Sequence, residues 1–178
     1  NMKTAYFRLS AAIALLAMCA ASSSAQKTSD KYLISAKAGG VNEIVGDVTV
    51  ERAGGRVGRL FKGDEVQVAE KIITGADGKA EILLNPGSYV RLGANSAFEF
   101  ESTALDDVRL RMHRGSALLE VLGAEDFDIS LAAESSKFTL LETGIYRIDV
   151  AADGKASVSV IKGRVRTGDV SDKPFGKG

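Results

Sequence analysis

The chain has 178 residues, with 23 basic and 23 acidic side chains, so its formal net charge at neutral pH is zero. This balance provides no global electrostatic attraction to nucleic acid, which favours proteins with excess positive charge. One cysteine, one histidine and no tryptophan leave few side chains for a cysteine-ligated metal centre or a histidine-dependent active site.

Residues 1–25 are predicted to be a secretory signal peptide. Lys3 and Arg8 precede an apolar run, and Ser23 with Ala25 forms a small-x-small cleavage site. The run is shorter than the roughly 20 apolar residues that a membrane-spanning helix needs. We therefore expect export to the periplasm or the cell exterior, with no membrane span after cleavage.

The single cysteine, Cys19, lies inside this predicted signal. The residues from Leu16 to Cys19 approximate a lipid-attachment signal, but Met18 stands where such signals have Gly, Ala or Ser. The sequence therefore disfavours a lipid anchor at Cys19. The processed chain would have no thiol, no disulfide and no cysteine ligand for a metal.

Residues 26–42 form a polar lead-in, and residues 43–168 change to short apolar runs separated by Gly, Asp and Asn. Runs at intervals of about 8–12 residues are typical of an all-β sandwich or barrel. No long stretch keeps the 3.6-residue apolar period of a helix. We expect one all-β domain, built as a sandwich or a flattened-barrel stack of antiparallel hairpins. The predicted strands are 43–51, 56–61, 65–68, 70–74, 80–84, 88–92, 97–101, 108–113, 116–121, 127–131, 137–141, 145–150, 156–161 and 163–167.

The pentapeptide Ala-Asp-Gly-Lys-Ala occurs at 76–80 and again at 152–156. The flanking apolar residues also match at the same offset, which is compatible either with two quasi-repeated halves or with convergent turn chemistry. In the second copy, a three-residue loop with a left-handed glycine keeps the apolar side chains of one hairpin on one face. The same loop in the first copy predicts that Ile72 lies opposite Ile82. The glycines expected to shape the scaffold through turns are Gly46, Gly63, Gly78, Gly87, Gly115, Gly154 and Gly163.

Neither pentapeptide is predicted to bind a metal, because each supplies one carboxylate followed by a lysine, and calcium requires several oxygen ligands. A better cation candidate is the acidic group of Glu125, Asp126 and Asp128. The alternation around Phe127 favours the start of a solvated strand instead. No metal and no cofactor are predicted.

His113 lies in the segment Val-Arg-Leu-Arg-Met-His-Arg, which alternates as a strand does. A hairpin with the preceding strand places apolar residues on one face and ion pairs on the other, each pair contributing about 0.2–1 kcal/mol. The arginines thus have partners within the chain, although a polyanion or acidic-protein site on this face is an alternative. No nucleophile motif accompanies His113, so no catalytic residue is predicted. The expected pairs are Phe98 with Met112, Phe100 with Leu110, Glu99 with Arg111 and Glu101 with Arg109.

Over residues 43–168, the order of these features resembles the FecR domain family. The pattern comprises a G-x-V-x-V opening, an L-x-x-G-D step, an Ile-Thr-Gly edge, a Gly-Ser turn, an Arg-Gly strand and a closing V-x-x-G-x-V. These motifs fall at Gly46 to Val50, Leu60 to Asp64, Ile73 to Gly75, Gly87-Ser88, Arg114-Gly115 and Val160 to Val165.

The resemblance implies an extracytoplasmic all-β domain. In the best-known members this domain lies in the periplasm, is joined through one membrane helix to a cytoplasmic anti-sigma segment, and relays the occupancy of an iron-siderophore transporter. This sequence begins with a cleavable signal instead, and has Thr143-Gly144-Ile145-Tyr146 where the family often has G-T-x-F/Y. These departures weaken the expectation of an iron or sigma-factor link.

We therefore expect a non-catalytic extracytoplasmic domain that contacts an envelope or periplasmic protein in signalling, regulation or assembly. Open sheet edges are the expected contact places, since unpaired backbone groups accept a partner strand. The alternative is a structural or adhesive module that binds polysaccharide or peptidoglycan. Residues 169–178 are polar and Gly-rich, as in a tail or the start of a linker to further protein.

Overall fold

A computed structural model of the chain describes residues 38–104, 106–124, 128–134, 136–168 and 173–176. These residues form β-strands and connecting turns, with no helix among them, so the all-β prediction is confirmed. The predicted signal peptide, the lead-in as far as residue 37, and Glu125 and Asp126 lie outside the described residues. The strands are β1 (Val41–Val45), β2 (Val48–Arg52), β3 (Arg56–Arg59), β4 (Lys71–Thr74), β5 (Lys79–Asn85), β6 (Ser88–Leu92), β7 (Ala97–Thr103), β8 (Asp107–Val121), β9 (Asp128–Ala133), β10 (Ser136–Leu140), β11 (Gly144–Val150), β12 (Ala156–Lys162), β13 (Arg164–Thr167) and β14 (Phe175–Gly176).

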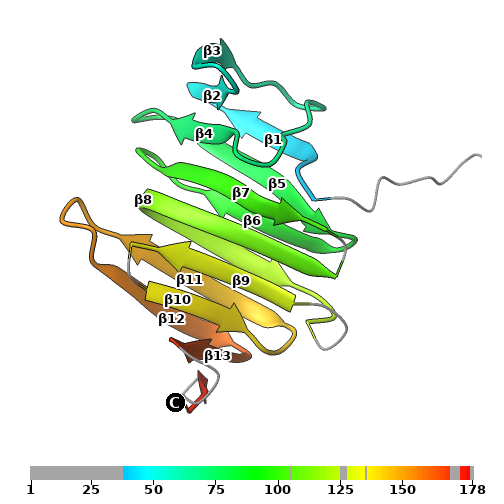
Figure 1. Cartoon of the computed structure of the whole chain (residues 1–178), viewed down its shortest axis with the longest axis vertical. Coiled ribbons are helices and arrows are strands. Elements are labelled where there is room, and N and C mark those ends of the chain that lie inside the picture. Colours follow the sequence, from blue (N-terminus) through cyan, green and yellow to red (C-terminus); the bar gives the residue numbers. More distant parts are fainter. Residues whose placement is uncertain (1–37, 105, 125–127, 135, 169–172, 177–178) are drawn as a thin grey trace, which may run out of the picture. The chain divides into compact units, whose positions relative to one another are not determined.

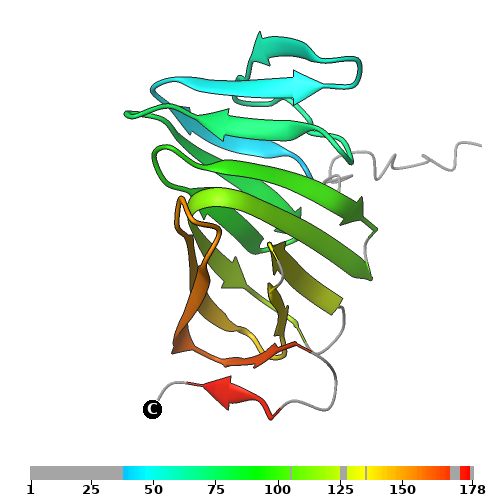
Figure 2. The same cartoon turned by 60° about the vertical axis from the view of Figure 1, so that its left-hand side comes forward.

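The described strands form one branched sheet, and the long strand β8 belongs to both branches. A six-strand branch has the order β1-β5-β6-β8-β11-β12, and a nine-strand branch has the order β3-β2-β4-β7-β8-β9-β10-β13-β14. Figure 1 shows the strands stacked as a ladder. Figure 2 shows the yellow-green β8 bending from one branch into the other. Among the described strands, β8 and β9 pair in parallel, which makes the sheet mixed.

The core lies between the two branches, because alternate residues of each strand point inward. Its members form a single cluster drawn from both branches. On the nine-strand branch, Phe98 lies opposite Met112 and Phe100 opposite Leu110, as predicted. The two phenylalanine rings pack edge to face, with centroids 5.2 Å apart, the geometry that aromatic quadrupoles favour.

Three glycines mark the places where the chain passes directly from one branch to the other. Gly46 joins β1 to β2, Gly115 lies at the bend within β8, and Gly163 joins β12 to β13; their φ angles are +67°, +89° and +96°. At Gly115, a Cβ atom would lie 2.3 Å from Ser96 Oγ. Each bend therefore depends on a backbone conformation that residues with a side chain rarely adopt. Gly46 also explains why the predicted strand 43–51 is two strands in the structure.

The two Ala-Asp-Gly-Lys-Ala segments occupy different places in the fold. The second forms the predicted β11–β12 hairpin, in which Ile148 lies opposite Val158. Its glycine, Gly154, has a φ of +81°. The first segment instead connects β4 of the nine-strand branch to β5 of the six-strand branch, so the predicted pairing of Ile72 with Ile82 is wrong.

Gly78, in the first segment, is not among the glycines with positive φ, so the predicted left-handed conformation there is also wrong. This position requires glycine for space, because a Cβ atom would lie 2.2 Å from the carbonyl oxygen of Asp47. Asp77 accepts a hydrogen bond from the backbone N–H of Asp47 at 3.2 Å. The other predicted scaffold glycines, Gly46, Gly63, Gly87, Gly115, Gly154 and Gly163, have positive φ.

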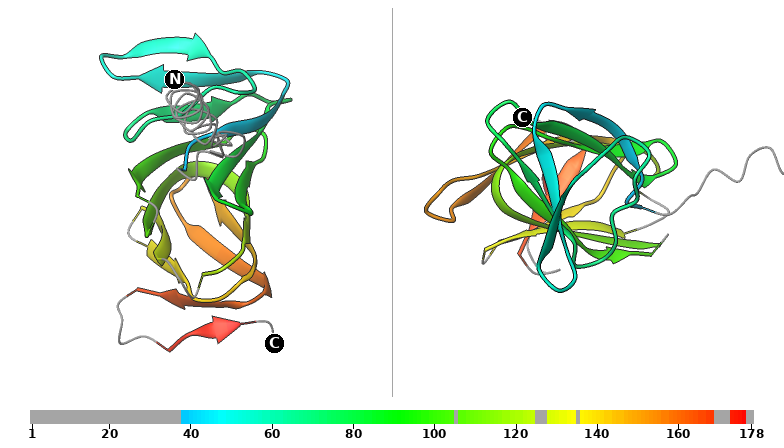
Figure 3. Two further views of the ribbon diagram at one scale, coloured as in Figure 1. Left: turned by 90° about the vertical axis from the view of Figure 1, so that its right-hand side faces the viewer. Right: turned by 90° about the horizontal axis from the view of Figure 1, so that it is seen from above.

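Other strand boundaries differ from the prediction for identifiable reasons. Residues 65–68 form isolated bridges at Glu65 and Val68 instead of a strand. The segments predicted as 108–113 and 116–121 are one strand, because β8 continues through its bend at Gly115. Figure 3 shows β13 and β14 at the C-terminal end of the ladder; β14 was not predicted, since only Phe175 in its surroundings is apolar.

Tyr146 secures the junction of β12 and β13. Its fully buried hydroxyl donates a hydrogen bond to the carbonyl of Glu142 at 2.6 Å and lies 3.2 Å from the carbonyl of Arg164. A Cβ atom on Gly163 would lie 2.2 Å from this hydroxyl. The Thr-Gly-Ile-Tyr segment, an apparent departure from the family pattern, therefore supplies the buried tyrosine of this corner.

Candidate functional site

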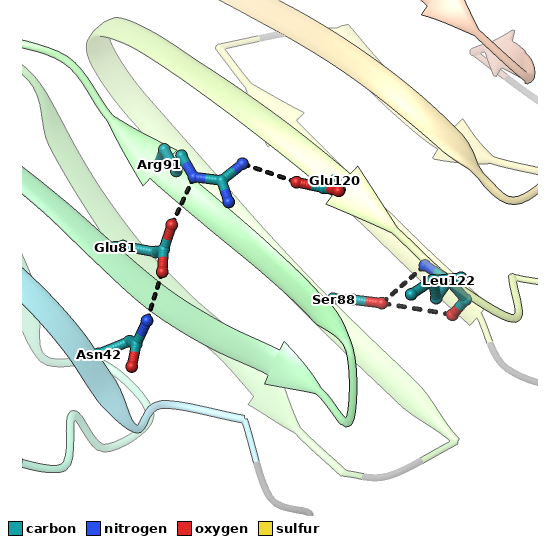
Figure 4. A network of polar contacts seen from close by, with 6 residues as sticks. All are labelled: Asn42, Glu81, Ser88, Arg91, Glu120 and Leu122. Atoms are coloured by element: carbon teal, nitrogen blue, oxygen red, sulfur yellow. Dashed lines mark hydrogen bonds and ion pairs between the residues drawn. The ribbon is translucent and has the colours of Figure 1, made fainter.

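The outer face of the six-strand branch carries a polar network around Arg91. The Arg91 side chain contacts Glu81 on β5 through Nε, and its Nη1 lies 2.8 Å from Glu120 Oε2 on β8. Asn42 Nδ2 donates to the other carboxylate oxygen of Glu81 at 2.5 Å. Figure 4 shows these residues in a line across four strands. Two acidic side chains thus hold the guanidinium in a defined orientation.

Hydrogen bonds and opposite charges keep Glu81 and Arg91 charged in spite of their burial. Burial of Glu81 opposes its ionisation, but the hydrogen bonds from Asn42 and Arg91 and the charge of Arg91 outweigh that effect and hold the pKa of Glu81 below its ordinary value. The hydrogen bond to Glu120, opposed by burial and supported by Glu81, raises the pKa of Arg91. The Glu81 carboxylate and the Arg91 guanidinium are therefore ionised at neutral pH.

Apolar side chains surround this network on the same face. Leu83 on β5 lies opposite Tyr89 on β6, and Leu118 on β8 lies opposite Arg91. Ile145 on β11 lies opposite Glu120, and all four apolar side chains are half-buried. An antiparallel sheet with one face on the core ordinarily has polar residues on its other face. This outer face, defined by Leu83, Tyr89, Arg91, Leu118, Glu120 and Ile145, is called the Arg91 face below.

A groove of about 350 Å³ adjoins the Arg91 face. Leu83, Pro86 and Tyr89 supply its apolar lining, and Asn42 and Asp64 supply polar side chains. Asp64 Oδ2 accepts a hydrogen bond from the backbone N–H of Phe61 at 3.0 Å, which orients the carboxylate. Gly40, Gly63 and Gly87 also line the groove.

At one end of the Arg91 face, the turn between β5 and β6 is tied to the end of β8. Ser88 Oγ donates to the carbonyl of Leu122 at 3.3 Å and accepts a hydrogen bond from the backbone N–H of Leu122 at 2.9 Å. Both bonds are drawn in Figure 4. The Leu122 side chain is 52% exposed, so it extends the apolar surface beyond the strand.

His113 lies on the outer face of the nine-strand branch, where the predicted ion pairs also occur. Glu99 lies opposite Arg111, as predicted, with 3.7 Å between Glu99 Oε1 and Arg111 Nε. His113 Nε2 is 3.3 Å from Glu99 Oε2. The predicted pairing of Glu101 with Arg109 is wrong, because the strand register shifts between Phe100 and Ser102. Glu101 contacts Arg111 instead, and Arg109 lies 3.5 Å from Asp107.

The two pentapeptide aspartates take part in turn contacts. Asp153 accepts a hydrogen bond from the backbone N–H of Lys155 at 3.1 Å, and its carboxylate lies 3.0 Å from Lys155 Nζ. The hydrogen bond from the Lys155 side chain is the main reason that the pKa of Asp153 is lowered. Among the residues described, no group of three or more His, Cys, Asp or Glu side chains is arranged to hold a metal ion.

The free edges of the two branches differ in length and charge. In the described part of the chain, β1 and β12 border the six-strand branch, and β3 and β14 border the nine-strand branch. Strand β1 contains a register shift, β3 is four residues long with an arginine at each end, and β14 has two residues. Strand β12 has seven residues and is uncharged from Ala156 to Ile161. It is therefore the edge best suited to accept another strand.

No helix within the described ranges is long and apolar enough to cross a membrane. The described residues form an all-β module, and its candidate site is the Arg91 face with the adjoining groove. A family model described as FecR protein matches residues 70–166, more than half of the chain. The chain belongs to the FecR family.

A solved crystal structure supports the fold. It is a proposed anti-sigma factor from Parabacteroides distasonis, with a TM-score of 0.51 and 17% sequence identity over 60% of this chain. The matched region spans 50% of that protein's own length. At this identity the likeness concerns the fold. A search of curated proteins finds no match.

The sequence indicated the scaffold of the site but not the site itself. Glu81, Arg91 and Glu120 alternate with apolar residues along three separate strands, so each resembles an ordinary solvent-facing residue. A weak signal was present in the apolar residues at Leu83, Tyr89 and Leu118, which stand at outward positions of strands that already bury an inner face.

Proposed function

We propose that this FecR-family protein is a non-catalytic, extracytoplasmic signalling regulator that binds another envelope protein through the Arg91 face. Family membership supports a regulatory role. The observation that carries the proposal is the ordered Arg91 guanidinium among half-buried apolar side chains. Arginine and aromatic residues such as tyrosine are enriched at protein-binding surfaces.

The geometry of the network favours binding for an energetic reason. Holding a long side chain in one conformation costs about 0.5–1.5 kcal/mol when it happens on association. Glu81 and Glu120 already restrict Arg91 before a partner arrives, so less of this cost remains. The Arg91 side chain is still 41% exposed, which leaves guanidinium surface for a carbonyl or carboxylate of the partner.

Photo-crosslinking in living cells tests this proposal. A photoreactive amino acid at Leu118, in the centre of the Arg91 face, should capture a protein that mass spectrometry identifies. The same group at Arg109, on the outer face of the nine-strand branch, is the matched control. Equal capture from both positions, or no capture at Leu118, would contradict the assignment of the face.

A pair of substitutions separates binding from folding. Arg91→Ala removes the ordered guanidinium and should abolish most of the capture, whereas Arg111→Ala removes a comparable ion-paired arginine from the other outer face and should leave capture intact. Urea unfolding of both variants provides the check on stability. Loss of capture in Arg111→Ala alone would place the partner on the opposite face.

Export can be tested independently by determining the N-terminus of the protein recovered from the periplasm. Signal-peptide removal predicts a chain that begins at Gln26. A full-length chain confined to the cytoplasm would refute the extracytoplasmic part of the proposal while leaving the binding surface to be judged by crosslinking.

The polysaccharide or peptidoglycan alternative has one observation in its favour, the half-buried Tyr89 beside Asn42 and Asp64 in the groove. An aromatic ring beside hydrogen-bonding groups suits a sugar. The exposed phenylalanines Phe61 and Phe175 do not line this groove. Co-sedimentation with purified peptidoglycan that is lost in Tyr89→Ala and retained in Arg91→Ala would favour this alternative.

A further inference from the structure

We propose that a second copy of this chain pairs with strand β12, so that two six-strand branches form one continuous antiparallel sheet. This inference is independent of the Arg91 face. It begins from the difference among the free edges. Natural sheets protect their edges with charge, short strands or bulges, and β12 from Ala156 to Ile161 has no charged residue.

The hydrogen-bond pattern of the β11–β12 hairpin shows which backbone groups of β12 face outward. The N–H of Ala151 donates to the carbonyl of Lys155 at 2.9 Å, which sets the alternation along the hairpin. In an antiparallel pair, bonded and non-bonded positions alternate. Ser157 and Ser159 are therefore hydrogen-bonded to β11 through their backbone groups. The backbone N–H and C=O groups of Ala156, Val158 and Val160 point away from β11, and these three residues are called the free positions of the edge.

The side chains of the free positions also lack cover. Ala156, Val158 and Val160 pack against the core but are only partly buried. A neighbouring strand would extend the inner face of the branch and remove more of this apolar surface from water, a gain of about 25 cal/mol per Å². The same strand would form hydrogen bonds with the outward N–H and C=O groups. A single partner strand would therefore cover the apolar side chains and pair the backbone groups of the free positions.

The sequence of β12 is complementary to itself. An antiparallel second copy, related by a twofold axis at Val158, places Ala156 opposite the second copy's Val160. It also places Ser157 opposite the second copy's Ser159, so small residues meet larger ones inside and hydroxyls meet outside. No charges face one another between 156 and 160, and the register carries Lys162 to the turn that contains Asp153, a carboxylate that is 55% exposed. At both ends of the pair, Lys162 of one copy lies near the Asp153–Lys155 ion pair of the other copy.

The arrangement has a consequence for the Arg91 face. A twofold axis normal to the sheet keeps the outer face of each copy on the same side. The dimer would then present two Arg91 faces on one surface. A partner with two binding segments would gain from their linkage, because the second contact becomes intramolecular.

Register-specific disulfide formation tests the dimer. In a Cys19→Ser background, which has no other cysteine, Ser157→Cys and Ser159→Cys variants are prepared separately from the periplasm of a bacterial host. Because cross-strand non-bonded positions lie closest, at about 4.5 Å between Cα atoms, oxidation of the mixture should produce disulfide-linked dimers. Each variant alone should remain largely unlinked, and equal linkage of either variant alone would overturn the register.

Light scattering after size-exclusion chromatography provides the second measurement. The parent protein should have twice the monomer mass, and Val158→Pro should have the monomer mass, because proline removes an outward N–H without removing a bond to β11. Ser159→Pro removes a bond to β11 and should lower stability, which circular dichroism distinguishes. A parent protein that stays monomeric up to about 100 μM, or a Val158→Pro variant that remains a folded dimer, would overturn the proposal.

The two proposals can fail separately. Folded, monomeric Val158→Pro should still be captured through Leu118 if the Arg91 face binds its partner as one copy. Dimerisation without capture would leave the self-pairing intact and refute the Arg91 face.

Discussion

Replacing Gly115 by alanine tests the bend of β8, on which the relation of the two branches depends. The residue has a φ of +89°, and the added Cβ atom would lie 2.3 Å from Ser96 Oγ and 2.5 Å from Ser96 Cα. Real Cβ atoms do not approach other atoms so closely, so the backbone of Ser96 must move. The variant should therefore be strained both in its own conformation and in its packing.

Gly63 provides a matched control. Its φ is +88°, but no atom lies within 4 Å of the position of an added Cβ. Gly63→Ala should destabilise the protein by about 1–2 kcal/mol through the left-handed conformation alone. Gly115→Ala has the same conformational cost and an overpacking cost of about 1–3 kcal/mol, so its total loss should be about 2–5 kcal/mol.

Urea unfolding followed by circular dichroism measures this difference. With a typical slope of about 2 kcal/mol per molar urea, the midpoint of Gly115→Ala should lie about 1 M below that of Gly63→Ala. Equal midpoints would show that Ser96 yields without cost and would refute the argument from close approach. A larger loss in Gly63→Ala would show that conformational strain alone controls these positions.

Three further predictions concern side chains. Tyr146→Phe should lower the free energy of unfolding by about 1 kcal/mol, because it removes the hydrogen bond from the buried Tyr146 side chain to the Glu142 carbonyl; denaturant titration measures this, and a neutral result would remove the tyrosine's role at the corner. The pKa of Glu81 is lowered from its ordinary value of about 4.5, so its charge stabilises the folded protein above pH 4.5, and this stabilisation is lost as the pH falls through the folded-state pKa. Glu81→Gln should therefore be less stable than the parent at pH 7, and the difference in the free energy of unfolding should shrink below pH 4.5. A difference that does not change with pH would contradict this linkage. Exchanging the charges of Glu99 and Arg111 should recover only part of the free energy of unfolding that the two single charge reversals lose, because the new acidic side chain at position 111 faces Glu101. A double-mutant cycle measures the coupling between the two positions. Complete recovery, or simple additivity of the single losses, would each exclude this three-residue arrangement.

Local sequence patterns were sufficient to predict most of the strands and the pairings β7–β8 and β11–β12. Alternation of apolar and polar residues identified the all-β fold, since a strand directs successive side chains to opposite faces. The same alternation predicted that Phe98 lies opposite Met112. At Gly154, the requirement to keep one face apolar selected the correct turn. These inferences concern neighbours in sequence, where pattern and turn geometry restrict the chain strongly.

Tertiary structure alone decided which glycines bend the chain between branches and which residues meet on the Arg91 face. Gly46, Gly115 and Gly163 have the same local signature as hairpin glycines, because positive φ suits both a turn and a corner. The difference comes from contacts such as Ser96 with Gly115, which join separate strands. Similarly, Arg91 and Glu120 meet only because β6 pairs with β8. Local propensity specifies a strand, but long-range packing and register choose its neighbour, and that choice created the candidate site.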